Sequence, residues 1–230
     1  MRRIIAFLLL ATVKTVSHVF FRGNFKWITK HPEKPFKKAR LIVFLNHTSL
    51  YEPIYLQAVS YDFLWHLAGN ANVPGADITL KRPIVGTFWK LMVPNIASVT
   101  RKKDSSWSTY LNSIRPESIV MIAPEGRMKR LNGLDKRGKP MTVQGGVADI
   151  IESMNEGGMV LCFSGGLHHI QSPGQHFPKL FRPISMNFAY FNLKEYKSSF
   201  TGSPREKKLS MVQDLQRRLE NDCPTVTWNK

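Results

Sequence analysis

A histidine and a carboxylate stand five residues apart, just after an apolar run ends. Leu41–Leu45 is followed by Asn46, His47 and, further on, Glu52. An imidazole can take a proton from a hydroxyl near neutral pH, and a carboxylate that contacts the ring orients it and stabilises its charged form. Five residues on a regular helix lie roughly 140° to 150° apart. Contact therefore requires His47 in a loop and Glu52 in a helix that begins near Leu50.

The same residues also allow an interpretation without catalysis. Ser49 and Glu52 have the spacing of a capping box, in which the serine caps a helix and the glutamate reaches back to its backbone N–H. His47 would then be an ordinary loop histidine. With 7 histidines and 16 acidic residues in the chain, roughly half a match to this spacing is expected by chance. The pair alone does not decide between the two interpretations.

Two further apolar runs end in cations. Ser118–Ala123 leads into the segment Pro124-Glu125-Gly126-Arg127-Met128-Lys129-Arg130, and Ile96–Thr100 leads into Arg101-Lys102-Lys103. Backbone N–H groups at a glycine turn, together with Arg and Lys side chains, suit a phosphate group. Composition alone would make both segments solvated basic loops. The two hypotheses for these segments are therefore a phosphate site and solvated basic loops.

Taken in order along the chain, these segments resemble one enzyme superfamily. Asn46-His47-x-Ser49-x-x-Glu52 is similar to the NHxSxxD signature of the glycerol-3-phosphate and lysophospholipid acyltransferases. Lys81–Arg101, with Gly86 in a predicted helix before a short strand, is similar to their second motif. Pro124-Glu125-Gly126 is similar to their FPEGTRS motif, and Val143-Gln144-Gly145-Gly146 to a later glycine-containing helix start. The resemblance covers most of residues 46–146.

The chain departs from the motifs of this superfamily at several positions. Glu52 stands where aspartate is usual, and Ala123 stands where phenylalanine is usual. Arg127-Met128-Lys129 replaces Thr-Arg-Ser, which shifts the arginine by one position. Asn70 and Asn72 occupy a region in which a lysine and a glutamate are expected.

The resemblance implies an O-acyltransferase of phospholipid biosynthesis or remodelling that uses neither a cofactor nor a metal. It would move a fatty acyl group from acyl-CoA or acyl carrier protein to a hydroxyl of a glycerol-phosphate or lysophospholipid acceptor, above all 1-acylglycerol-3-phosphate. His47 would be the general base and Glu52 its support. The acceptor phosphate would be held by Arg101, Glu125, Gly126 and Arg127, with Asn46, Ser49, Lys102, Lys129 and Arg130 as further candidates and Lys102 also a candidate for the oxyanion. The alternative is a non-catalytic, basic, membrane-binding protein of the same fold.

The alternation of apolar runs predicts an α/β fold, a single domain with a mixed central sheet flanked by helices. Strands are predicted over Leu41–Leu45, Phe63–Ala68, Ile96–Thr100, Ser118–Ala123, Gly158–Phe163 and Ile184–Phe191. Helices are predicted over Leu50–Val59, Pro83–Val93, Ser105–Ile114, Gly146–Met154 and Pro204–Asn221.

Residues 1–22 predict a membrane-associated helix ahead of the acyltransferase domain, residues 23–230. The helix is lopsided, because Lys14 and His18 share one side while most of its large apolar side chains lie on others. A spanning helix needs about 20 apolar residues, and a lysine near its middle costs roughly 2.5 kcal/mol or more. We therefore expect an interfacial helix at the cytoplasmic face of a membrane, in preference to a single spanning anchor or a signal peptide.

The chain carries 33 Lys and Arg against 16 Asp and Glu, a formal charge of +17. Such a charge favours anionic partners. We expect three kinds of partner: membrane lipids that form an anionic surface, the thioester donor and the lysophospholipid acceptor. Nucleic acid is not expected, because no recognition helix, zinc module or aromatic-basic RNA motif occurs. Cys162–Gly166 lacks the serine-hydrolase elbow, and neither the cysteines nor the adjacent His168 and His169 have metal-ligand spacing.

Overall fold

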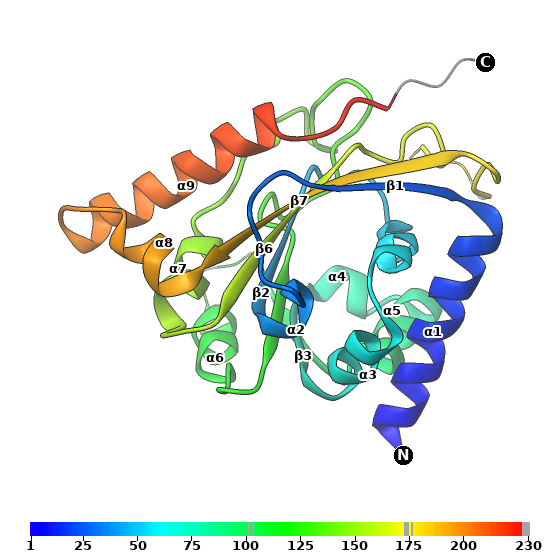
Figure 1. Ribbon diagram of the computed structural model, residues 1–230, viewed down its shortest axis with the longest axis horizontal. Helices are drawn as coiled ribbons and strands as arrows, with labels where there is room; N and C mark the ends of the chain where they lie inside the picture. Colours follow the sequence, from blue (N-terminus) through cyan, green and yellow to red (C-terminus); the bar gives the residue numbers. More distant parts are fainter. Residues whose placement is uncertain (101, 103, 173–174, 176, 227–230) are drawn as a thin grey trace.

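The computed structural model describes residues 1–100, 102, 104–172, 175 and 177–226. Its centre is a seven-stranded sheet in the order β1-β7-β6-β2-β5-β3-β4 (Figure 1). The strands are β1 (Arg22–Trp27), β2 (Ala39–Leu45), β3 (Ala71–Ala76), β4 (Asn95–Val99), β5 (Ile119–Ile122), β6 (Gly158–Ser164) and β7 (Pro183–Asn192). Neighbouring strands are parallel except β6 and β7, which are antiparallel. The predicted fold class, a mixed sheet flanked by helices, is confirmed.

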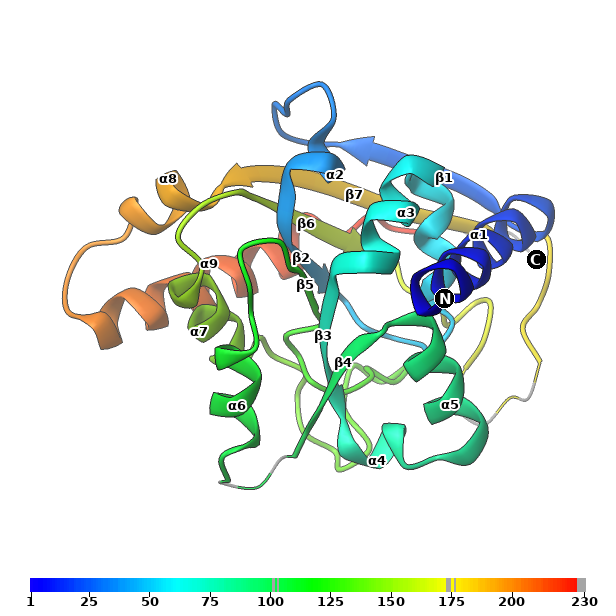
Figure 2. The same cartoon turned by 90° about the horizontal axis from the view of Figure 1, so that it is seen from below.

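Helices cover both faces of the sheet (Figures 1 and 2). They are α1 (Arg2–Phe20), α2 (Pro35–Lys38), the 3-10 helix η1 (Glu52–Ala58), α3 (Tyr61–Asn70), α4 (Asp77–Leu80), α5 (Pro83–Met92), α6 (Ser106–Asn112), α7 (Gly146–Ser153), α8 (Leu193–Ser198) and α9 (Pro204–Asn221). Side chains of β2 contribute to two hydrophobic cores, because successive side chains of a strand point to opposite faces of the sheet. Ile42 packs under α1, η1 and α3, whereas Leu41 and Val43 pack under α6, α7 and α9.

Two predicted elements differ from the structure. The run Phe63–Ala68 lies in helix α3 and not in a strand, because Ser60 caps the helix by accepting a hydrogen bond from the N–H of Phe63. Its buried residues fall at helical spacing, on the side that faces the core. The helix predicted from Leu50 begins at Glu52 and is a 3-10 helix. The other five predicted strands and four predicted helices are present within one or two residues of their expected ends.

Helix α1 turns its polar side toward the protein. Lys14 is buried, and its ammonium donates to the carbonyl of Gln57 at 2.8 Å. Ser17 donates to the carbonyl of Ile54 at 2.6 Å. The large apolar residues Leu8 and Val19 are 57% and 62% exposed. Among the described helices, α1 alone is long and apolar enough, by length and composition, to cross a membrane.

Candidate active site

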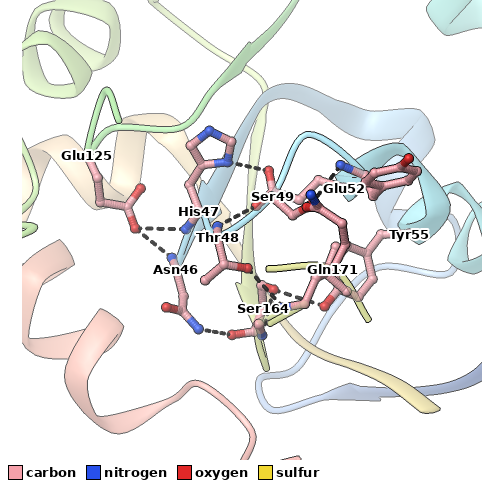
Figure 3. A network of polar contacts seen from close by, with 12 residues as sticks. Asn46, His47, Thr48, Ser49, Glu52, Tyr55, Glu125, Ser164 and Gln171 are labelled. Carbon is pink, nitrogen blue, oxygen red and sulfur yellow. Dashed lines mark hydrogen bonds and ion pairs between the residues drawn. The ribbon is translucent and has the colours of Figure 1, made fainter. Parts of the chain in front are cut away.

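The chain turns sharply where β2 ends. Asn46 has a φ of 67°, in the left-handed region that asparagine adopts more readily than most residues. Its side-chain amide donates to the carbonyl of Ser164 at the end of β6, 2.8 Å away. The turn brings His47 off the sheet and into the loop that leads to η1 (Figure 3).

His47 and Glu52 are in contact, in the arrangement of loop and helix start that the spacing predicted. Nδ1 of His47 lies 2.6 Å from one carboxylate oxygen of Glu52 (Figure 3). The other oxygen accepts from the N–H of Thr48 at 2.9 Å. The two side chains are 18% and 14% exposed. Because Nδ1 must carry its hydrogen to donate to a carboxylate, Nε2 carries the free lone pair of the neutral ring.

The capping-box interpretation describes only part of this geometry. Glu52 does accept from a backbone N–H, but that group belongs to Thr48 and not to Ser49. Ser49 accepts from the N–H of Tyr51 at 3.2 Å and donates to the side chain of Gln171 at 3.0 Å. Glu52 therefore holds the imidazole and the loop that carries it with one side chain.

Opposing effects act on the pKa of His47. Burial of the ring lowers the pKa, and the charge of Glu52, its hydrogen bond and the charge of Glu125 all raise it. The net direction is upward. The carboxylates thus stabilise the imidazolium that a general base becomes after it takes a proton.

Glu125 binds the main chain of the histidine loop. Only 6% of the residue is exposed, and Oε1 accepts from the N–H of Asn46 at 2.6 Å and from that of His47 at 3.3 Å. Its second oxygen has no hydrogen-bond partner among the described residues. Burial raises the pKa of Glu125, against the lowering effect of these N–H groups and of His47. The resemblance placed Glu125 among the residues that hold the acceptor phosphate, and its observed partners are backbone amides.

The other predicted phosphate ligands lie at different distances from the pair. Arg127 lines the cavity beside His47, but its guanidinium forms an ion pair with the buried Asp135. Gly126, which has a φ of 66°, and Arg130 line the same cavity. The ammonium of Lys129 reaches the amide oxygen of Asn46 at 3.5 Å. Lys102 is exposed and outside the described cavity lining, and Arg101 lies outside the described residues.

Three contacts that the sequence did not predict connect the His47 loop with two other segments of the chain. The hydroxyl of Thr48 accepts from the N–H of Leu167 at 2.9 Å. The N–H of Lys129 donates to the carbonyl of His47 at 2.8 Å, and His168 contacts the carbonyl of Lys129 at 2.7 Å. The three segments are far apart in the sequence and carry no shared motif, so only the folded chain shows that they meet.

A cavity of about 870 Å³ opens beside His47 and Glu52. Its inner part is apolar and extends under α1, η1 and α3, where its lining includes Leu10, Phe36, Phe63, Cys162 and Phe188. Cations of the loop between β5 and α7 and of the start of α5 also line it, namely Arg127, Arg130, Lys136 and Arg137 from the loop and Arg82 from the helix start. The volume suits a ligand of the size of a lipid. A proton acceptor, an apolar chamber and an anion-attracting wall thus meet in one place.

A family model described as Acyltransferase matches residues 27–179. The chain belongs to the acyltransferase family. The match includes both His47 and Glu125, and it confirms the superfamily that the four sequence motifs resembled. Among the described residues, no group of three or more His, Cys, Asp or Glu side chains is placed to hold a metal ion.

The acyltransferase fold of the chain is similar to a solved structure. The crystal structure of the 1-acyl-sn-glycerophosphate (LPA) acyltransferase PlsC from Thermotoga maritima superposes with a TM-score of 0.61 at 13% sequence identity. The alignment covers 100% of this acyltransferase and 83% of the PlsC chain. At this identity, the likeness establishes the fold. A comparison with curated proteins gave no significant match.

Proposed function

We propose that this acyltransferase moves a fatty acyl group from acyl-CoA or acyl carrier protein to the free hydroxyl of 1-acylglycerol-3-phosphate. The observation that carries the proposal is the 2.6 Å contact of His47 with Glu52 at the wall of a largely apolar cavity. A lone histidine–carboxylate pair can activate a hydroxyl, and the apolar volume beside it accepts a fatty chain. The catalytic proposal requires neither a cofactor nor a metal.

The reaction begins with proton transfer to His47. Nε2 takes the proton of the acceptor hydroxyl while its oxygen attacks the thioester carbonyl carbon, whose π electrons move onto the carbonyl oxygen. Glu52 stabilises the imidazolium through Nδ1. The tetrahedral intermediate then collapses, the carbon–sulfur bond breaks, and the leaving thiolate takes the proton from the imidazolium. An ester and a thiol are released, and His47 is neutral again.

The acceptor phosphate is assigned to the basic wall of the cavity. Arg127 and Arg130 belong to the loop after β5, and Arg82 belongs to the start of α5. Their charges attract a phosphate monoester, and a phosphate held there positions its glycerol hydroxyl for the base, an effect that can supply several kcal/mol. Asp135 holds Arg127 in place before the substrate arrives, which lowers the entropy lost on binding.

The fatty chain of the donor or of the acceptor is assigned to the apolar part of the cavity. Phe63 and Leu67 of α3, Phe188 of β7 and Leu10 of α1 close this part. Burial of each methylene group contributes roughly 0.8 kcal/mol. The binding free energy of a chain that fills the cavity therefore grows with the length of the chain, and this supports a long-chain substrate.

We assign α1 to a membrane surface. Its polar residues Lys14 and Ser17 bond inside the protein, and its exposed surface includes Ile4, Leu8, Val16 and Val19. An apolar helix side of this kind is stabilised in the interfacial layer of a bilayer. Leu10 on the opposite side lines the cavity, so the helix brings the lipid-binding chamber close to the membrane that supplies the acceptor.

The catalytic proposal is tested by thiol release from a long-chain acyl-CoA, with and without 1-acylglycerol-3-phosphate. His47→Ala is compared with His31→Ala, which removes an exposed histidine whose ring contacts the adjacent carbonyl of Pro32. We expect acceptor-dependent release that falls about 10²- to 10⁴-fold in His47→Ala alone. If acyl carrier protein is the donor, release appears only with that thioester. Equal acceptor-dependent release in wild type and His47→Ala would refute the assigned base, and no release from either thioester would favour the non-catalytic alternative.

A further inference from the structure

A second pocket lies outside the catalytic cavity, between α1, α2 and α3. Its volume is about 460 Å³, and its lining consists of Arg3, Lys34, Lys37, Lys38, Asp62, Trp65 and His66. None of these residues lines the catalytic cavity. Figure 1 shows the three helices together on one side of the sheet, opposite α8 and α9. The family motifs contribute none of the lining residues.

The charges in this pocket are unbalanced. Four cations face one carboxylate, that of Asp62, which pairs with Lys37 at 2.8 Å. Within the described part of the chain, neither Lys34 nor Lys38 forms a close ion pair with a carboxylate, although the charge of Lys34 acts on Asp62. Like charges that line one pocket repel one another, and an anion between them removes the repulsion.

Two residues of the lining are held firmly. Arg3 donates two hydrogen bonds to the carbonyl of Trp65, at 3.2 and 3.0 Å, and its guanidinium stacks 4.3 Å over the indole ring. Phe7 packs edge-on against the same ring. The cation is therefore placed before any ligand binds, as a preorganised anion site requires.

His66 lies in the same positive field. Burial lowers its pKa, and Arg3, Lys37 and Arg40 lower it further against the opposing effect of Asp62. The neutral ring can donate one hydrogen bond to an anion, so the titration of His66 can be used to detect anion binding. An anion bound among these cations would raise the pKa of His66, because it would offset their charge.

We propose that this pocket binds the phosphate group of an anionic phospholipid headgroup in the membrane that α1 contacts. The proposal rests on the membrane seating of α1 and not on catalysis by His47. Ile4, which follows Arg3 in the chain, and Leu8 are exposed on the N-terminal half of α1. Trp65 and Tyr61 are also partly exposed, on α3. Aromatic and cationic side chains beside an apolar surface match the headgroup layer of a bilayer.

The first test measures binding of the full chain to vesicles. Lys34→Gln/Lys38→Gln removes two pocket charges and leaves the Lys37–Asp62 pair. Lys194→Gln/Arg205→Gln removes the same charge from exposed positions on α8 and α9. Vesicles are phosphatidylcholine alone or with phosphatidic acid. The pocket variant should lose roughly tenfold or more of the affinity for phosphatidic acid vesicles, and the control less than about threefold. Equal losses in both variants, or no loss in either, would overturn the pocket assignment.

The second test separates a lipid headgroup from a free phosphate. The ring signals of His66 are followed by NMR while inorganic phosphate is added, in wild type and in the pocket variant. We expect phosphate to shift the signals and raise the His66 pKa in wild type only. The pocket variant, which lacks this response, should also be the one that loses vesicle binding. A phosphate response with unchanged vesicle binding would overturn the lipid assignment in favour of a soluble phosphate compound. Two controls distinguish this proposal from the catalytic one. The pocket variant should release thiol normally, and His47→Ala should bind vesicles normally.

Discussion

The carboxylate of Glu125, at the end of β5, accepts a hydrogen bond from the backbone N–H of His47, at the end of β2, over 3.3 Å. The two strands are neighbours in the sheet, and the contact joins the loops that follow them. A stronger bond from Asn46, at 2.6 Å, shares the same oxygen. The motif glutamate therefore positions the loop that carries His47.

Glu125→Gln and Glu125→Ala should have different effects. Glutamine keeps an oxygen for both N–H groups, so we expect melting and loop geometry close to wild type. Alanine leaves two buried N–H groups without an acceptor and should lower the free energy of unfolding by about 1 to 3 kcal/mol, together with kcat. Urea unfolding and steady-state kinetics of both variants check this. Equal loss of activity in the two variants, with stability intact, would instead assign Glu125 to direct substrate contact.

Replacing Glu52 tests the support of the imidazole. Glu52→Gln should reduce kcat about 10²- to 10⁴-fold, because the amide neither fixes the Nδ1–H tautomer nor stabilises the imidazolium. Glu52→Asp restores the charge on a shorter arm and should recover part of that loss. The two variants are compared by acceptor-dependent thiol release at saturating substrate. Equal rates in Glu52→Gln and wild type would count against the pair.

The pH profile should report the raised pKa of His47. Only the neutral ring accepts a proton, so kcat/KM should increase with pH up to the raised pKa and then level off. In Glu52→Gln the charge and the hydrogen bond that raise the pKa are gone, while burial still lowers it. The acidic limb of the profile should therefore move to lower pH in the variant. A limb that stays in place would mean that another group controls it.

Arg127 and Asp135 separate phosphate binding from loop structure. If Arg127 contacts the acceptor phosphate, Arg127→Ala should raise the KM of the acceptor at least tenfold and that of the thioester much less. Asp135 accepts from the N–H groups of Arg137 and Lys139 as well as from Arg127. Asp135→Ala should therefore loosen the whole loop and lower the melting temperature. Steady-state kinetics and thermal melts distinguish the two effects, and an unchanged acceptor KM in Arg127→Ala would remove it from the phosphate site.

Surface substitutions on α1 test membrane seating better than deletion of residues 1–22. Ala6 and Leu10 belong to the core, so removal of the helix would open the cavity beside His47. Leu8→Gln/Val19→Gln changes only exposed side chains and should weaken vesicle binding by roughly 1 to 2 kcal/mol for each residue. Leu209→Gln, an exposed apolar residue of α9, is the control. Unchanged sedimentation with vesicles would move the membrane contact elsewhere.

Local patterns predicted the parts of the fold that local physics decides. β2, β5 and β6 are apolar runs bounded by turns, and they sit at the centre of the sheet. The contact of His47 with Glu52 was also predictable, because a strand, a loop and a helix start follow one another within a few residues. β3 was missed, since its sequence contains Pro74 and Gly75, which are unfavourable in strands.

The remaining features depend on residues that meet only in the folded chain. The sequence cannot show that Glu125 faces backbone amides, that Asp135 pairs with Arg127, or that Lys14 points inward to Gln57. The contacts of Glu125 and Lys14 join residues 79 and 43 positions apart, whereas Arg127 and Asp135 are 8 positions apart in one loop. The strand predicted at Phe63–Ala68 was wrong for a related reason. A short apolar run fits either element, and the cap at Ser60 together with packing against α1 favoured the helix.

The pairing of β1 with β7 sets an order on the assembly of the enzyme. Arg22 pairs with Pro183, and Trp27 pairs with Phe188. During synthesis, β1 therefore cannot pair in the sheet until β7, the last strand, has been made. At usual rates of synthesis, the wait is roughly 8 to 30 seconds. Met186 and Phe188 of β7 also line the cavity beside His47. A nascent chain that ends before β7 therefore already carries its apolar first helix while the cavity beside His47 still lacks part of its lining.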